Sequence, residues 1–204
     1  MFETVLYPPG ATRGVLLIHG GRGRGAHEEE RRERFAALGY AVYVPDLFGA
    51  APTLESITAL AGDAVELRRR VVAAWDVLAR RVPVTFAVGH CFGGLAALEL
   101  ARAGVGVRAV VSLHGMLTTV KPVEKITTRV LACCGAADPY CPPAQRSAFD
   151  AEMTAAGVDW QLHVYGGAKH GFSVPGIVRE GCEYNADADR RSWDAMLALF
   201  AETT

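Results

Sequence analysis

The sequence lacks an excess of charge of either sign. Its 204 residues carry 21 lysine and arginine side chains and 22 aspartate and glutamate side chains, so the formal net charge is −1. A chain without a basic excess gives no sign of a positively charged surface that would bind nucleic acid or an acidic membrane. We therefore expect neither of these as a partner.

Long apolar runs are also missing. No uninterrupted stretch approaches the roughly 20 apolar residues that a membrane-spanning helix needs. The first residues, MFETV, lack the basic and then apolar pattern of a secretory signal. These two absences predict a cytoplasmic protein.

The cysteines form no recognisable metal or redox motif. Their number is odd, and their spacings match neither a zinc site nor a C-x-x-C pair. A chain of this length needs no disulfide or metal for stability, and free cysteines fit a reducing compartment. We expect no metal. The cysteines are Cys91, Cys133, Cys134, Cys141 and Cys182.

What the sequence does contain is an alternation of short apolar runs with longer helical patterns. This alternation predicts an α/β fold with a mostly parallel central sheet and helices on both faces. No linker or repeat interrupts it, so residues 1–204 are expected to form a single domain. The expected strands are 14–19, 41–44, 84–88, 107–113, 129–134 and 160–165, with a weakly marked strand near 3–7. The expected helices are 28–38, 55–81 with a break near Gly62, 92–102, 142–156 and 187–201.

The stretch VGHCFGG, residues 88–94, joins a buried strand to a helix rich in alanine and leucine. This is the context of a nucleophile elbow, usually written G-x-S-x-G, with cysteine in place of serine. Side chains at Gly89 and Gly93 would clash with neighbouring backbone in so tight a turn, and Gly94 lets the helix pack on the sheet. Cys91 would stand at the helix N-terminus, whose partial positive charge favours a thiolate. A cysteine taken alone would more often be a packing residue.

Two later strands end in loops that carry a carboxylate and an imidazole. Asp138 follows the strand near 130, and His170 follows the strand near 162. The carboxyl ends of parallel strands form the functional edge of an open sheet, so both side chains are expected near Cys91. Cys91 would attack, His170 would shuttle the proton and Asp138 would fix the histidine tautomer.

Further residues are candidates for contacts around this site. The expected oxyanion donors are the backbone N–H groups of Phe92 and Gly21. His19 and His90 are expected to hold loops in place, and His27 is expected to be exposed. The candidates for substrate binding are Arg22, which would suit a carboxylate or else be a solvated loop residue, together with His114, Tyr140 and Phe172.

With these motifs the chain resembles the dienelactone hydrolase family of α/β-hydrolases over nearly its whole length. The stretches that carry the resemblance are LLIHGGRG, LGYAVYVPDLFG, VGHCFGG, CCGAADPYCPP and YGGAKHGF. The resemblance implies an α/β-hydrolase fold with no cap domain and no metal or organic cofactor. It also implies a triad of Cys91, His170 and Asp138 that acts on lactones or small esters.

One position departs from the family pattern. Dienelactone hydrolases typically have Ile-His-Glu at the end of the first buried strand, and that glutamate helps to form the thiolate. This chain has Gly20 in its place, which leaves the activation of Cys91 to His170 and the helix N-terminus. Whether a later carboxylate reaches the site stays open at this point. The acidic residues that follow are Glu28, Glu29 and Glu30.

The expected function is hydrolysis of a lactone or small ester through an acyl-thioenzyme on Cys91. One alternative keeps the triad in a carboxylesterase or thioesterase, which the glycine at position 20 favours. The other is a non-catalytic or redox-responsive protein with a reactive Cys91 on the same scaffold. The expected partner is a small-molecule ester or lactone, and the protein is expected to be a monomer or a small homo-oligomer.

Overall fold

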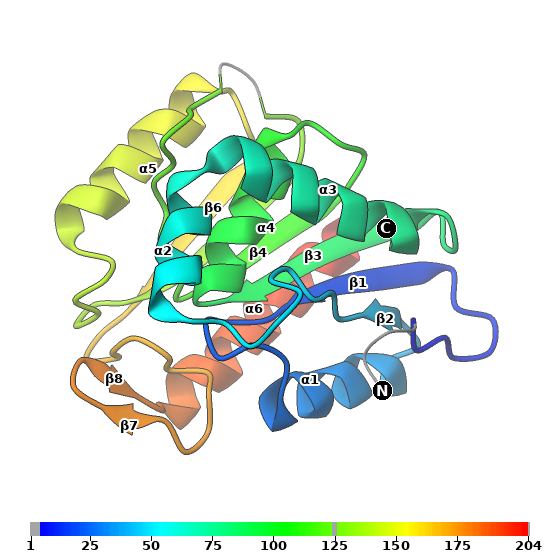
Figure 1. Cartoon of the computed structure of the whole chain (residues 1–204), viewed down its shortest axis with the longest axis horizontal. Helices are drawn as coiled ribbons and strands as arrows, with labels where there is room; N and C mark the ends of the chain where they lie inside the picture. The colour runs from blue at the N-terminus through cyan, green and yellow to red at the C-terminus, as the bar shows by residue number, and fades with distance from the viewer. Residues whose placement is uncertain (1–4, 124–125, 204) are drawn as a thin grey trace.

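The computed structural model describes residues 5–123 and 126–203 of the chain. Its main feature is a six-stranded sheet in the order β2-β1-β3-β4-β5-β6, in which every neighbouring pair is parallel (Figure 1). The strands are β1 (Arg13–Ile18), β2 (Ala41–Tyr43), β3 (Val84–His90), β4 (Ala109–Leu113), β5 (Arg129–Gly135) and β6 (Trp160–Tyr165). A separate two-stranded hairpin consists of β7 (Val178–Arg179) and β8 (Cys182–Glu183).

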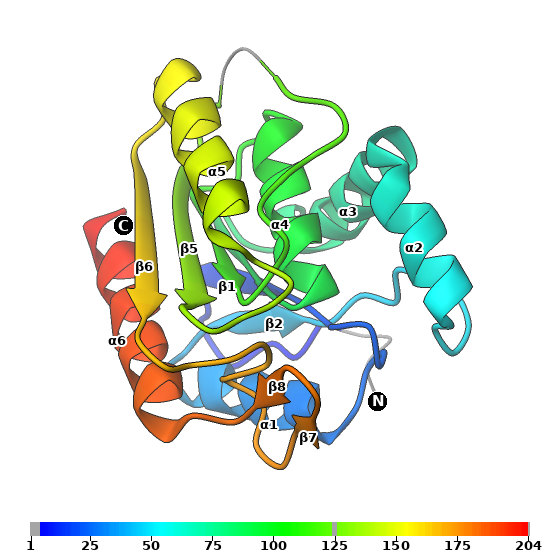
Figure 2. The ribbon, with the colours of Figure 1, turned by 90° about the vertical axis from the view of Figure 1, so that its left-hand side faces the viewer.

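Helices cover both faces of the sheet. Helices α1 and α6 pack on one face, and α3, α4 and α5 pack on the other, with α2 leading into α3 (Figures 1 and 2). The predicted α/β-hydrolase architecture is therefore confirmed, and within the described ranges no cap domain covers the sheet. The helices are α1 (Ala26–Ala37), α2 (Leu54–Gly62), α3 (Ala64–Ala79), α4 (Phe92–Arg102), α5 (Pro143–Ala155) and α6 (Ala186–Glu202).

The two helical layers follow from the alternation of side chains along each strand. In β1, Val15 and Leu17 join the core with α1 and α6, whereas Leu16 and Ile18 join the core with α3 and α4. A strand that is buried on both faces reads as a continuous apolar run, which is the pattern that predicted it. None of the helices in the described ranges is long and apolar enough to cross a membrane.

Three features differ from the sequence predictions or extend them. The long helix breaks at Asp63, whose side chain accepts a hydrogen bond from the N–H of Glu66 and so begins α3. The expected strand near 3–7 lies partly outside the described residues, and Leu6 forms a single antiparallel bridge to Val42. The β7–β8 hairpin was not predicted, because strands of two residues show no periodicity.

Helix α4, which follows the elbow, is held by a buried ion network. All of its residues are buried, including Glu99 and Arg102. The Arg102 guanidinium donates to Glu99 at 3.0 Å, to Glu152 of α5 at 2.6 and 2.8 Å, and to the Leu117 carbonyl at 2.8 Å. Because a buried charge without its partners is costly, these contacts fix the last turn of α4 against α5.

Candidate active site

A cavity of about 480 Å³ lies at the edge of the sheet where the carboxyl ends of the strands meet. Its walls come from residues 20–28, from α2, from the turn between β3 and α4, and from residues 170–179. Helix α2 and the β7–β8 hairpin therefore flank the same opening, and both lie on the left of Figure 1. Cys91, His114 and His170 all line it, as expected from the strand order.

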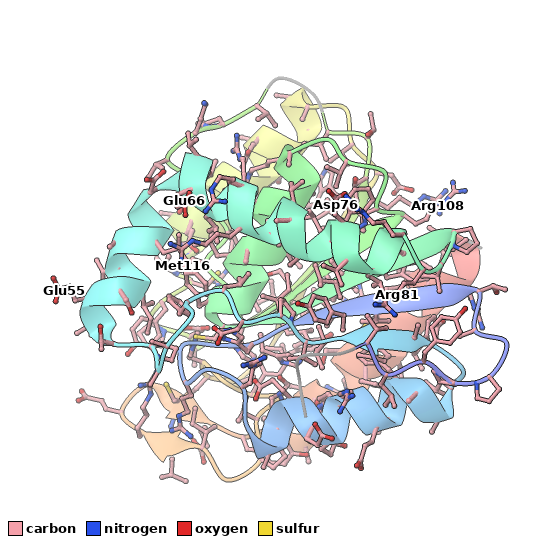
Figure 3. All side chains as sticks on the ribbon, turned by 45° about the vertical axis from the view of Figure 1, so that its right-hand side comes forward. Glu55, Glu66, Asp76, Arg81, Arg108 and Met116 are labelled. Carbon is pink, nitrogen blue, oxygen red and sulfur yellow. The ribbon has the colours of Figure 1, made fainter. Side chains whose placement is uncertain are left out.

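A second hollow, of about 660 Å³, lies on the outer side of α3. Two of its lining residues, Asp76 and Arg81, are labelled in Figure 3. It sits where α3 ends and the chain enters the amino end of β3, which is the edge of the sheet opposite the functional one. Its polar lining consists of one carboxylate and two guanidinium groups, without a nucleophile, so the first cavity is the candidate site.

The turn that carries Cys91 has the geometry of a nucleophile elbow. Cys91 has φ +55° and ψ −117°, in a region that residues with a side chain rarely adopt. A Cβ on Gly89 would lie 1.8 Å from the Gly93 carbonyl oxygen, and one on Gly93 would lie 2.2 Å from that of Ile18. A Cβ on Gly94 would meet Ser112 Oγ at 2.6 Å. The predicted reason for these three glycines is confirmed.

The structure brings the three predicted triad residues into one hydrogen-bonded line. The Nε2 atom of His170 lies 3.1 Å from Cys91 Sγ, and its Nδ1 atom lies 3.0 Å from Asp138 Oδ2. Asp138 and His170 are buried, and Cys91 is partly exposed to the cavity. The other carboxylate oxygen of Asp138 accepts from the N–H of Tyr140 at 2.8 Å, which fixes its orientation.

The environment of this line favours a thiolate and an imidazolium. Burial raises the pKa of the Cys91 thiol, but the hydrogen bond and charge of His170 outweigh it and bring that pKa below its ordinary value. Burial lowers the pKa of His170, but hydrogen bonds to Asp138 and Cys91 outweigh it and raise that pKa to about 10. An ordinary thiol is only a few per cent ionised at neutral pH.

Both expected oxyanion donors face the same sulfur. The backbone N–H groups of Gly21 and Phe92 interact with Cys91 Sγ and lower its pKa. One belongs to the loop after β1, and the other is the first residue of α4. Two N–H groups that converge at a nucleophile are the arrangement that stabilises an oxyanion formed there.

Behind the elbow lies a polar chain that was only partly predicted. The N–H of Cys91 is shared between the Leu113 carbonyl at 3.0 Å and His114 Nδ1 at 3.2 Å, so the neutral ring of His114 carries its proton on Nε2. That Nε2–H donates to Ser173 Oγ at 2.9 Å, and the hydroxyl donates to His90 Nδ1 at 3.0 Å. Burial lowers the pKa of both histidines well below the usual value, so both stay neutral.

The prediction that His27 is exposed is wrong. Its ring is half-buried, lines the cavity and packs edge-on against His90 at 4.6 Å between ring centroids. Neither ring nitrogen has a hydrogen-bond partner among the described residues. Burial lowers its pKa to about 4. The prediction failed because α1 starts at Ala26, two residues earlier than expected, and this turns position 27 inward.

The four candidates for substrate contact are placed differently from one another. Arg22 and His114 line the cavity. Tyr140 is exposed beside the ring of His170, with 4.9 Å between centroids, but it is not among the lining residues. Phe172 is fully buried against His114 and faces the core, so its predicted contact with substrate is not supported.

Two lining residues carry chemistry that sequence reasoning did not assign. Arg179, on β7, lines the cavity and donates to Cys182 Sγ at 3.0 Å. The β7–β8 hairpin could have been indicated by the glycines that precede and divide it, in Pro-Gly at 175–176 and Glu-Gly at 180–181. Of the three glutamates left open above, only Glu28 lines the cavity.

The described residues include no group of three or more His, Cys, Asp or Glu that could hold a metal ion.

Comparison with known proteins supports a common ancestry. An uncharacterised protein of Caenorhabditis elegans is 37% identical over 149 residues, which are 67% of this chain and 94% of that protein. A dienelactone hydrolase-like promiscuous phosphotriesterase from metagenomic libraries is 34% identical with a TM-score of 0.85, covering 98% of this chain and 88% of its own. The structure named m3DLH is 35% identical with a TM-score of 0.86, covering 95% of this chain and 88% of its own.

The family assignment comes from a match that extends almost from end to end. The model of the dienelactone hydrolase family matches residues 2–204. The fold, the cysteine elbow and the position of the cavity agree with that match. The chain therefore belongs to the dienelactone hydrolase family, a family of hydrolases with the α/β-hydrolase fold.

Proposed function

We propose that the protein hydrolyses a lactone or small ester through an acyl-thioenzyme on Cys91. The observation that carries this proposal is the convergence of three groups on one sulfur atom. The Nε2 atom of His170 lies 3.1 Å from Sγ, and the N–H groups of Gly21 and Phe92 face it. A base and two oxyanion donors at one nucleophile are the parts that acyl transfer requires.

In the first half of the reaction, the Cys91 thiolate attacks the carbonyl carbon of the substrate. The carbonyl oxygen becomes an oxyanion, which accepts hydrogen bonds from the N–H groups of Gly21 and Phe92. When the C–O bond breaks, the imidazolium of His170 donates its proton to the leaving oxygen. In a lactone the ring opens and the leaving hydroxyl stays attached to the acyl group. Asp138 holds the His170 ring throughout.

In the second half, neutral His170 takes a proton from water, and the resulting hydroxide attacks the thioester carbon. The C–S bond breaks, Cys91 leaves as a thiolate, and the product is a carboxylic acid that ionises. One water is consumed for each bond hydrolysed, and the thiolate–imidazolium pair is restored. The water reaches the thioester through the cavity that Cys91 lines.

The lining of the cavity favours a substrate with one anionic end. Arg22 and Arg179 place two guanidinium groups at its wall, and guanidinium binds carboxylates in bidentate geometry. Ile57 of α2 and Ile177 add apolar surface between the loops. A small lactone that bears a carboxylate matches this combination better than a neutral ester does.

The test is a panel of substrates given to the wild-type protein. It contains enol-lactones with and without a carboxylate, short p-nitrophenyl esters and matched thioesters. It also contains a phosphotriester, because one 34% identical structure is a dienelactone hydrolase-like phosphotriesterase. We expect the carboxylate-bearing lactone to have the highest kcat/KM and quenched samples to carry the acyl mass on Cys91. Arg179→Gln should raise KM for the carboxylate-bearing lactone and leave KM for the neutral lactone unchanged.

Three results would contradict the proposal. One is the absence of turnover for every lactone and carboxylic ester. Another is turnover without any acyl adduct on Cys91 in mass spectra of rapidly quenched samples. The third is a protein that gains only oxygen on Cys91 after mild peroxide and never an acyl group, which would favour the redox-responsive alternative.

A further inference from the structure

The loop that carries one of the two oxyanion donors has little of its own to hold it in place. Residues 20–25 read Gly-Gly-Arg-Gly-Arg-Gly, so four of six positions have no side chain. Within the loop, the N–H of Gly23 donates to the Gly20 carbonyl at 3.0 Å. Glycine backbone loses more conformational freedom on ordering than any other residue type. An ordered glycine loop therefore needs anchors from outside itself.

Besides the ion pair of Arg24 with Asp46 at 3.3 Å, two side chains supply such anchors. The N–H of Leu47 donates to His19 Nε2 at 3.4 Å, so His19 carries its proton on Nδ1 and donates it to the Gly20 carbonyl at 2.8 Å. The second anchor is Glu28, whose Oε2 accepts from the N–H of Gly25 at 2.9 Å. The N–H of Gly20 also interacts with the Glu28 carboxylate and lowers its pKa. One carboxylate thus joins both ends of the loop.

Glu28 is not a solvated residue of a helix face. Only 6% of it is exposed, and it lies in the wall of the cavity. Burying a carboxylate is costly unless N–H donors surround it. Burial raises the pKa of the Glu28 carboxyl above its ordinary value, and the N–H groups of Glu28 itself, Gly25 and Gly20 act against that rise.

We propose that Glu28 is a positioning residue, which clamps Gly20 to Gly25 and so holds the N–H of Gly21 against the reacting centre. The inference rests on the proposed function, because the oxyanion that Gly21 would stabilise belongs to that reaction. Gly21 lies directly after the clamped Gly20, so a shift of Gly20 moves the donor. Neither the loop glycines nor the triad residues can hold the loop in this way, because none of them joins Gly20 to Gly25.

This role differs from direct activation of the thiol. A Cβ on Gly20 would lie 3.4 Å from the Cβ of Cys91, whereas the N–H of Gly20 faces the carboxylate. The backbone of Gly20 therefore contacts both Glu28 and the nucleophile. The groups that lower the pKa of Cys91 are His170 and the N–H groups of Gly21 and Phe92. Glu28 acts on the sulfur only through the Gly21 donor, whose effect on the pKa of Cys91 is smaller than that of the hydrogen bond and charge of His170.

The experiment compares Glu28→Ala and Glu28→Gln with Glu33→Gln, which removes the same charge from an exposed position of α1. Glutamine keeps one acceptor oxygen but offers an N–H₂ group to the second donor, so its effect should be intermediate. Near-ultraviolet circular dichroism and thermal unfolding check that each variant is folded. The glutamine variant keeps the volume of the side chain and covers the case in which the alanine variant fails to fold.

We expect Glu28→Ala to lower kcat by about 10- to 100-fold, a large part of the effect of losing one oxyanion donor. KM should stay within about twofold, because the ground state of the substrate does not use the oxyanion donors. Hydrogen exchange at the amides of Gly20 and Gly25, followed by NMR, should accelerate by about tenfold or more. Alkylation of Cys91 below the ordinary thiol pKa should persist, because His170 is intact.

Two outcomes would overturn the proposal. The first is that the Glu28 variants keep the kcat of Glu33→Gln, or keep the slow exchange of Gly20 and Gly25. The second is that they lose the alkylation of Cys91 at low pH, which would mean direct activation of the thiol. The exchange measurement decides about the clamp even if wild-type protein hydrolyses no ester. A failure of the proposed function can therefore be told apart from a failure of this inference.

Discussion

Replacing Cys91 with alanine is expected to lower kcat/KM for lactone or ester hydrolysis by about 10⁴-fold or more. The nucleophile, its base and its orienting acid act as one unit, so the removal of one member removes nearly the whole covalent pathway. Steady-state kinetics on the best substrate of the panel measures the effect. Cys91→Ser should fall almost as far, because a serine hydroxyl in the same place has no lowered pKa to make it ionise.

The matched control for this prediction is Cys133→Ala. Cys133 lies at the end of β5 with no exposed surface, and it is not among the residues that line the cavity. Its removal should cost stability but should leave kcat/KM within about twofold of wild type. If Cys91→Ala keeps more than about a tenth of the wild-type activity, the acyl-thioenzyme pathway is wrong.

The second large effect is expected for His170→Ala, again about 10⁴-fold in kcat/KM. The ring is placed to accept the proton of the thiol and to donate to the leaving oxygen, so both halves of the reaction depend on it. Added imidazole should restore part of the activity if the alanine variant leaves a hole of the right shape. The control is His163→Ala, on β6, which packs edge-on against Tyr165. Equal losses in the two variants would contradict the assigned role.

The elbow and its partners could be predicted because they follow from short-range rules. Glycines at 89 and 93 indicate the tight turn, and their missing side chains leave room that backbone atoms fill. Asp138 and His170 could be predicted because parallel strands place their carboxyl ends at one edge of the sheet. Both rules need only the order of apolar runs and the residues that follow each run.

The contacts that sequence reasoning missed come from loops whose paths no periodicity encodes. Ser173 lies between His90 and His114, three segments of the chain that meet only when the sheet has formed. Arg179 reaches the cavity through a hairpin too short to show alternation. Its closeness to His170 in sequence predicts Phe172 as a cavity residue. Its backbone turns the ring toward the core instead.

The pH titration of the Cys91 thiol in the free wild-type protein tests most directly how the nucleophile is activated. The ultraviolet absorbance of the thiolate and the rate of alkylation by iodoacetamide both report its ionisation. A thiol with a lowered pKa stays ionised above that pKa and loses its charge only as the pH falls through it. His170, with a pKa raised to about 10, keeps its proton across the same range and so preserves the pair.

We expect an inflection for Cys91 clearly below the ordinary thiol value of about 8.5. We also expect His170→Ala to move the inflection to that value or above, because burial then raises the pKa of the thiol without its partner to oppose it. An inflection at or above about 8.5 in the wild-type protein would contradict the central claim that His170 and the two backbone N–H groups suffice to activate the nucleophile.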